Sequence, residues 1–202
     1  MEKIDLKKRW KAFYAPSASE ISVVDIPAFR YLMIDGKGDP NSSRGYSEAV
    51  EALFSVSYTA KFSLKKLGSI DYSVMPLEGL WWSDSMDDFR TGKKDEWCWT
   101  MMVMQPECVT EELWRDAIGT VRRKKDLPGL SRIRLEVFHE GTSAQILYRG
   151  PYSGEASTIN RLHESIAVNN RLLTGKHHEI YLNDPRRTAP EKLRTIIRQP
   201  FR

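Results

Sequence analysis

The stretch Val103-Met104-Gln105-Pro106 closes one predicted strand, and Ile197-Arg198-Gln199-Pro200 closes another in the same way. Each stretch ends the same order of elements, which is a strand, a helix and two further strands. In the first half this order runs from about residue 21 to residue 106, and in the second half from residue 131 to residue 202. A repeated element order with a repeated ending indicates an internal duplication.

Helices are predicted where apolar residues recur at spacings of three and four. This periodicity covers residues 47–67 and residues 155–173, and we expect Gly175 to end the second of these helices. A third helix is predicted over residues 110–125, where Thr110 is a suitable N-terminal cap. This helix connects the two halves.

Strands are predicted where short apolar runs are bounded by Gly, Pro or Asn. They cover residues 23–26, 29–34, 72–82, 97–104, 133–137, 144–149, 178–182 and 193–198. The fold class is therefore α+β, with two strand-helix-strand-strand units forming an antiparallel sheet. We expect the helices on one face and, on the other, a groove at the pseudo-twofold axis, because a groove between repeats is a natural ligand site.

The whole chain, residues 1–202, is predicted to form a single domain. Within it we expect an N-terminal arm over residues 1–20, a first repeat over 21–106, a connecting helix over 107–130 and a second repeat over 131–202. The length of 202 residues suits one large domain or two small repeats that share a core.

Composition indicates a soluble protein, with 41% hydrophobic and 29% charged residues. The longest apolar run, residues 97–104, is too short to span a bilayer. The N-terminus also lacks the apolar segment and cleavage site of a secretory signal. We therefore expect a cytoplasmic location and no membrane partner.

The net charge of +4 is modest, although basic residues cluster at 122–125 and between residues 186 and 202. A nucleic-acid-binding protein needs such a basic footprint together with an element that reads a groove. The sequence carries no helix-turn-helix, zinc-finger or RNA-binding signature. We interpret the basic clusters as solvated surface and expect no nucleic-acid partner.

Candidate chemistry concentrates in the predicted strand that contains Glu179 and Tyr181. Side chains alternate between the faces of a strand, so we expect Ile180 and Leu182 to face the helices and Glu179 and Tyr181 to face the other way, toward bulk water or the groove. A carboxylate in an aromatic cleft loses hydration and can bind a cation or act as a general base. A Glu–Tyr pair on an ordinary surface remains the alternative.

Tryptophan is concentrated on two predicted strands that flank one loop, as Trp81, Trp82, Trp97 and Trp99. Within residues 97–104 both strand faces are apolar, with Trp97, Trp99 and Met101 on one of them. Since helices cover only one face, a loop, a partner or a ligand must cover the other. Aromatic walls suit flat ligands, and each cation contact contributes about 0.5–2 kcal/mol. Filling of the core or a homodimer interface is the alternative.

Glu78 is a second candidate acid, because it shares a strand face with Trp82. An ion pair that serves only the structure remains the alternative. His177, His178 and Glu179 do not form a convincing metal site, since neighbouring strand residues point to opposite faces. We therefore expect neither a metal nor a cofactor.

Four stretches resemble the stand-alone GyrI-like small-molecule-binding proteins over nearly the whole chain. They are Tyr31 to Asn41 (YLMIDGKGDPN), Met75 to Trp82 (MPLEGLWW), Gly150-Pro151-Tyr152, and Glu179 to Arg187 (EIYLNDPRR). The resemblance implies the duplicated strand-helix-strand-strand fold. It also implies that Glu179 matches the central acidic residue with which relatives fused to DNA-binding modules sense drugs.

Similar stand-alone members are associated with hydrolysis of the cyclopropane ring in DNA-alkylating antibiotics. The resemblance thus implies a cyclopropanoid cyclopropyl hydrolase that detoxifies such compounds. In this role Glu179 would orient or activate water and Tyr181 would donate a hydrogen bond. One departure is Tyr148, where the family commonly has histidine. The complete set of expected ligand-binding residues is Tyr31, Glu78, Trp82, Trp97, Trp99, Met101 and Tyr152.

The expected function is binding of flat hydrophobic or cationic small molecules in an aromatic and acidic cleft, with hydrolysis left open. Two alternatives remain. A drug-sequestering protein would use the same cleft without turnover. A protein-interaction module with a gyrase-type partner would instead use the basic surface.

Overall fold

The computed structural model describes residues 2–83 and 93–202. The chain divides into two compact units. The first comprises Met1–Leu6, Phe29–Met75 and Trp81–Phe138, and the second comprises Lys7–Ala28, Pro76–Leu80 and His139–Arg202.

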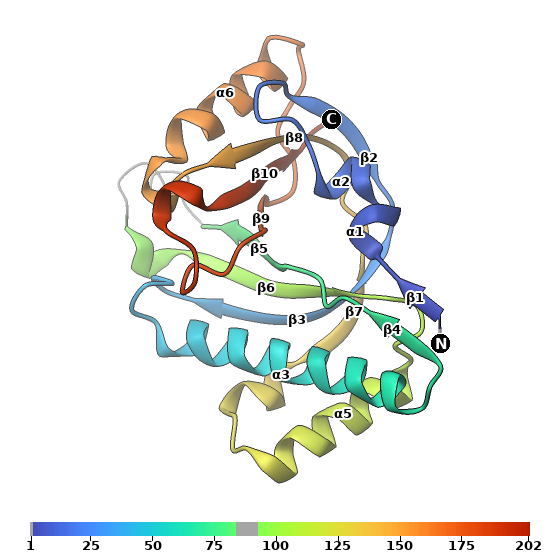
Figure 1. Cartoon of the computed structure of the whole chain (residues 1–202). Helices are drawn as coiled ribbons and strands as arrows, with labels where there is room; N and C mark the ends of the chain where they lie inside the picture. Colours follow the sequence, from blue (N-terminus) through green and yellow to red (C-terminus); the bar gives the residue numbers. More distant parts are fainter. Residues whose placement is uncertain (1, 84–92) are drawn as a thin grey trace. The chain divides into compact units, whose positions relative to one another are not determined.

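In the first unit, strand β3 (Phe29–Lys37) pairs antiparallel with β6 (Cys98–Gln105) on one side and with β7 (Arg134–Phe138) on the other. Helix α3 (Arg44–Lys66) packs on β3 and β6, and helix α5 (Glu111–Lys124) packs on α3 (Figure 1). Helix α3 therefore forms the predicted helix layer against the sheet of this unit, and α5 packs on α3.

Helix α3 follows the predicted apolar periodicity. Leu53, Val56 and Ala60 are fully buried, so the face with spacings of three and four packs into the core of the first unit. The helix begins three residues earlier than predicted, because the side chain of Ser43 accepts a hydrogen bond from the backbone N–H of Tyr46 and caps it. Thr110 caps α5 in the same way, as predicted.

In the second unit, β8 (Gly141–Arg149) lies between β2 (Ser22–Ile26) and β10 (Arg194–Pro200), and β9 (His177–Tyr181) borders β10. All three pairings are antiparallel. Helix α6 (Ala156–Ala167) packs on β8 and β10. The core of this unit is made by Ala144, Ile146, Leu162, Ile166 and Ile197.

The element order confirms the predicted duplication and the α+β class. The first half runs β3, α3, β5 (Leu77–Trp82), β6, and the second half runs β8, α6, β9, β10. The strand that leads each half, however, pairs in the other half. β2 precedes β3 in the chain but pairs with β8, while β7 precedes β8 but pairs with β3. The domain boundaries expected from the sequence remain a prediction.

Two further boundaries differ from the sequence prediction. The strand expected over residues 72–82 is two strands, β4 (Ile70–Tyr72) and β5, because Pro76 between them has no N–H to donate. The helix expected to reach residue 173 ends at Ala167. Asn170 adopts a left-handed backbone with φ 55°, and the N–H of Arg171 donates to Ile166 over 3.2 Å, which closes the helix before Gly175.

The remaining elements are short. β1 (Glu2–Ile4) pairs parallel with β4, and the helices α1 (Leu6–Arg9) and α2 (Lys11–Tyr14) follow it. Single 3-10 turns cover Lys94–Glu96, Pro128–Arg132, Tyr152–Gly154 and Pro190–Lys192. In the described ranges, no helix is both long enough and apolar enough to cross a membrane.

Candidate functional site

Glu179 and Tyr181 lie on the same face of β9, as strand alternation predicts. This face is not opposite the helices as expected, because Glu179 pairs with Ile197, which packs in one core with Leu162 of α6. The Tyr181 hydroxyl donates to Oε2 of Glu179 over 2.7 Å, and Nε2 of His177 lies 3.1 Å from Oε1. The Glu179 side chain is only 15% exposed. Both carboxylate oxygens are thus held in place, and the group is screened from water without being sealed off.

Tyr152 brings a second aromatic ring to this face. Its ring centroid lies 5.6 Å from that of Tyr181 in an edge-to-face arrangement. Burial and the nearby negative charges of Glu155, Glu179 and Asp184 raise the pKa of Tyr152 to about 12. Tyr152 therefore keeps its proton and remains a hydrogen-bond donor at physiological pH.

Sequence reasoning missed Glu155, which directly precedes α6. The residue is only 4% exposed, and its Oε1 atom is buried without a hydrogen-bond partner among the described residues. Burial, followed by the charge of Glu179, raises the pKa of Glu155 to about 8, although Thr195 opposes the shift. At neutral pH this carboxyl carries a proton.

Sequence reasoning also missed His163, which projects from α6. Its ring stands edge-to-face with that of His177, with 6.4 Å between the centroids. Burial, together with the charge of His177, lowers the pKa of His163, so its ring favours the neutral form. We use the name carboxylate cluster for Tyr152, Glu155, His163, His177, Glu179 and Tyr181, all of the second unit.

Glu78 lies in a different set of contacts, which we name the buried ion network. Oε1 of Glu78 accepts from the Tyr14 hydroxyl over 2.7 Å, and Oε2 lies 3.0 Å from Nε2 of His178. Nδ1 of His178 lies 2.9 Å from Glu140, which accepts from Nη1 of Arg198 over 3.0 Å. Glu78 thus forms the ion pair left open by the sequence, and its predicted role in ligand binding remains untested.

The side chains of this network are almost wholly removed from water. Burial by itself lowers the pKa of His178, but Glu140 and Glu78 outweigh it and raise the value to about 8. Burial likewise opposes ionisation of Glu140, but His178 and Arg198 lower its pKa to about 2. Two carboxylates and two cations therefore balance inside the second unit.

The network also fixes the segment around α2. Nη2 of Arg198 donates to the backbone carbonyl of Phe13 over 2.7 Å, and the Gln145 amide donates to that of Ala12 over 2.7 Å. Arg198 is itself held by Oε1 of Gln145. Buried cations that donate to backbone carbonyls tie a chain segment firmly in place.

The first unit has an aromatic cluster of its own. The ring of Tyr46 stacks on Trp81 at 6.2 Å and meets Trp99 edge-to-face at 5.4 Å, and Trp81 meets Trp97 at 6.0 Å. Trp99 is fully buried and covers Gly36, where an added Cβ would lie 2.1 Å from the indole. These contacts make Trp99 a core residue of the first unit.

Other expected ligand-binding residues of the first unit are also buried or half-buried. Tyr31 is 1% exposed and Met101 is fully buried, whereas Trp82 and Trp97 keep intermediate exposure. A role in ligand binding for these residues, and for Trp99, remains a prediction.

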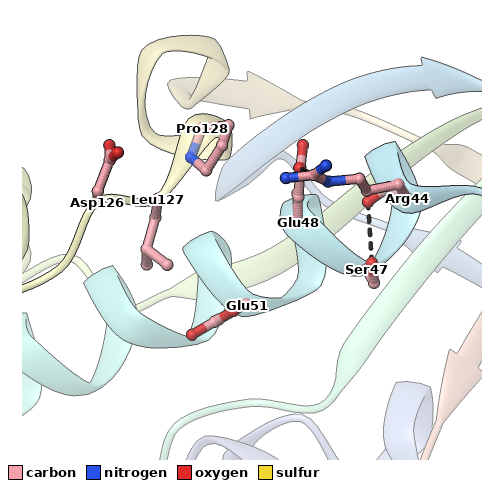
Figure 2. A pocket seen from close by; sticks show the side chains of 7 residues that line it. All are labelled: Arg44, Ser47, Glu48, Glu51, Asp126, Leu127 and Pro128. Carbon is pink, nitrogen blue, oxygen red and sulfur yellow. Dashed lines mark hydrogen bonds and ion pairs between the residues drawn. The ribbon is translucent and has the colours of Figure 1, made fainter.

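A surface depression on the first unit offers a poor match to an apolar ligand. Its volume is about 270 Å³, and Figure 2 shows its lining, which is Arg44, Ser47, Glu48, Glu51, Asp126, Leu127 and Pro128. Three of its charged side chains are paired, since Nε of Arg44 lies 2.8 Å from Glu48 and Lys125 lies 3.1 Å from Glu51. Ligand sites are usually more apolar and more enclosed.

A metal centre finds no support in residues 2–83 and 93–202, where no group of His, Cys, Asp or Glu is arranged to hold an ion. The carboxylate cluster is thus the best candidate site. It combines two carboxyl groups, of which Glu155 is protonated at neutral pH, with two imidazoles and two tyrosine hydroxyls. Such a set can bind a cation and can move protons.

Comparison with solved structures yields full-length matches. An uncharacterized conserved protein from Listeria innocua is 40% identical, with a TM-score of 0.90 over 98% of this chain and 100% of that one. A hydrolase from Listeria innocua is 39% identical, with a TM-score of 0.85 and the same coverage. The EcmrR C-terminal domain shares the fold alone, at 12% identity and a TM-score of 0.56 over 91% of this chain and 97% of that one.

No curated protein sequence matches this chain. The family model of the GyrI-like small molecule binding domain, by contrast, matches residues 19–202. This match spans both halves of the duplicated fold and includes the whole carboxylate cluster. The chain therefore belongs to the family of GyrI-like small molecule binding domains.

Proposed function

We propose that the protein binds a flat apolar or cationic small molecule at the carboxylate cluster and hydrolyses strained cyclopropanoid electrophiles. One observation carries the proposal: the Glu179 carboxylate is largely screened from water and is held by Tyr181 and His177. A screened carboxylate beside tyrosine rings attracts cations, and each ring contact contributes about 0.5–2 kcal/mol. Two structural neighbours that are named hydrolases support turnover.

Ring opening of a cyclopropane conjugated to a carbonyl needs one base and one acid. The water oxygen forms a bond to a ring carbon, and the ring C–C bond breaks. Its electron pair moves to the conjugated carbonyl, whose oxygen takes up a proton while the attacking water loses one. In this scheme the Glu179 carboxylate accepts the proton from water, Tyr181 holds that carboxylate in place by donating its hydrogen bond, and a solvent water supplies the proton to the carbonyl oxygen.

Such a reaction consumes a DNA-alkylating compound, so we propose a detoxifying role in the cytoplasm. Two free thiols, Cys98 and Cys108, are consistent with a reducing compartment. Sequestration without turnover would use the same contacts and would also protect the cell.

The test compares Glu179→Gln with Glu164→Gln, a matched change at an exposed position of α6. Binding is measured by fluorescence titration with ethidium, a flat permanent cation. Turnover is measured by mass spectrometry with a synthetic cyclopropyl cyclohexadienone, whose product gains one water. We expect Glu179→Gln to bind ethidium about tenfold more weakly, a loss of about 1.4 kcal/mol, and to form no product.

Equal affinity and equal turnover in Glu179→Gln and wild type would refute the proposal. Ethidium binding that depends on Glu179, together with no product in any protein, would refute hydrolysis and favour sequestration. An equal loss of affinity in Glu164→Gln would show that the effect is not specific to the carboxylate cluster and would contradict binding there.

A further inference from the structure

Glu155 and Glu179 are two carboxyl groups in one partly screened site, and their surroundings differ. Glu179 has a hydrogen-bond partner for each oxygen, Tyr181 on one side and His177 on the other. Glu155 is more deeply buried, and its Oε1 atom has no partner in the described part of the chain. A deeply buried carboxyl with one unpartnered oxygen favours its neutral form, and Thr195 only partly opposes this, whereas a donor to each oxygen stabilises an ionised carboxylate. One proton in the pair therefore resides on Glu155.

The titratable and polar groups near Glu155 come from several strands and from the segment before α6. They include no lysine or arginine in the contacts of the described residues. The hydroxyls of Tyr148 and Tyr152 keep their protons, because the pKa of each is raised. The neighbouring groups are Glu179 on β9, Thr195 on β10, Tyr148 on β8 and Tyr152 before α6.

We infer that Glu155 sets the charge preference of the site by keeping its proton beside a neutral ligand and releasing it to solvent when a cation binds. The inference rests on the proposed function and adds a residue that decides specificity. A neutral ligand would meet one carboxylate and one hydroxyl-like donor. A cation would meet two carboxylates, because its positive charge replaces the proton between them. One site could thereby accept flat ligands of either charge.

Proton release makes this inference measurable on the wild-type protein. Ethidium serves as the cationic probe, and phenanthridine serves as its flat neutral counterpart. Calorimetric titrations at pH 7 in phosphate and in Tris, two buffers that differ in ionisation enthalpy, give the number of protons released per ligand. We expect close to one proton for ethidium and none for phenanthridine. Ethidium affinity should rise up to about tenfold per pH unit between pH 6 and pH 8 and then level off.

The variant Glu155→Gln imitates the protonated side chain and cannot release a proton. We expect it to bind ethidium with neither proton release nor pH dependence between pH 6 and pH 8. Glu164→Gln, the exposed control, should release the proton normally. Far-UV circular dichroism checks that each variant is folded.

The outcomes separate this inference from the proposed function. Ethidium binding that needs Glu179 but releases no proton in the wild type overturns the inference alone. Continued release of one proton by Glu155→Gln also overturns it, because another group must then be the source. Failure of the wild type to bind ethidium, or binding that ignores Glu179, overturns the proposed function and this inference together.

Discussion

The buried ion network should make the protein less stable as the pH rises past neutrality. His178 is the titrating group, and Tyr14, Glu78, Glu140 and Arg198 surround it. Its pKa is about 8 in the folded protein, against 6.5 for an ordinary histidine. A raised pKa gives stability that is fully present below pH 6.5 and is lost as the pH rises through 8.

The magnitude follows from the difference of about 1.5 pH units, since each unit corresponds to about 1.4 kcal/mol. The contribution of His178 to the free energy of unfolding is thus about 2 kcal/mol. The larger pKa shift of Glu140 does not affect this window, because Glu140 stays ionised throughout it. The pKa of Glu140 is lowered to about 2, so its stabilisation is present above pH 4.5 and is lost only in acid.

The assay is urea unfolding, followed by far-UV circular dichroism between pH 6 and pH 9. It compares wild type, His178→Gln and His139→Gln, an exposed control. His178→Gln should be less stable at pH 6, and its deficit should shrink by about 2 kcal/mol by pH 9. Glu155 also loses stabilisation as the pH rises through 8, but equally in all three proteins. A deficit that stays constant from pH 6 to pH 9 would refute the reasoning.

Two further stability predictions use matched controls. Tyr14→Phe removes the donor to a buried carboxylate and should lower the free energy of unfolding by about 1–3 kcal/mol, while Tyr58→Phe on the exposed face of α3 should change little. Gly36→Ala places a Cβ inside the ring of Trp99, so we expect a loss of about 1–3 kcal/mol and an altered near-UV spectrum. Gly119→Ala in α5 has room and should stabilise by about 0.5–1 kcal/mol. Equal urea midpoints within either pair would contradict that prediction.

Sequence patterns predicted the elements of the fold because those patterns are local. Leu53, Val56 and Ala60 recur at helical spacing in the sequence, and the apolar face that they form is the one buried in the core. The exchange of β2 and β7 between the halves is not local. Either strand could pair with β3 or β8 on its own alternation, and the choice depends on tertiary packing.

The candidate site shows the same division. Alternation along β9 was enough to put Glu179 and Tyr181 on one face, and their hydrogen bond agrees with it. The place of Glu155 in the candidate site could not be predicted, because Glu155 precedes a helix in the sequence and reaches Glu179 only through tertiary packing. The contacts of His178 with Glu78 and Glu140 could not be predicted for a related reason, since both residues are distant from His178 in the chain.

The two faces of β9 differ in how their charged side chains are balanced. Behind the strand, His178 meets two carboxylates and Arg198 completes the balance, so this face needs nothing from outside. On the other face, Glu155 and Glu179 meet no lysine or arginine in the contacts of the described residues. Glu179 has a basic neighbour in His177 at 3.1 Å, and screened negative charge in excess of that one partner must hold a proton or attract a cation. The excess of carboxyl groups on this face is therefore the physical reason to expect a ligand there.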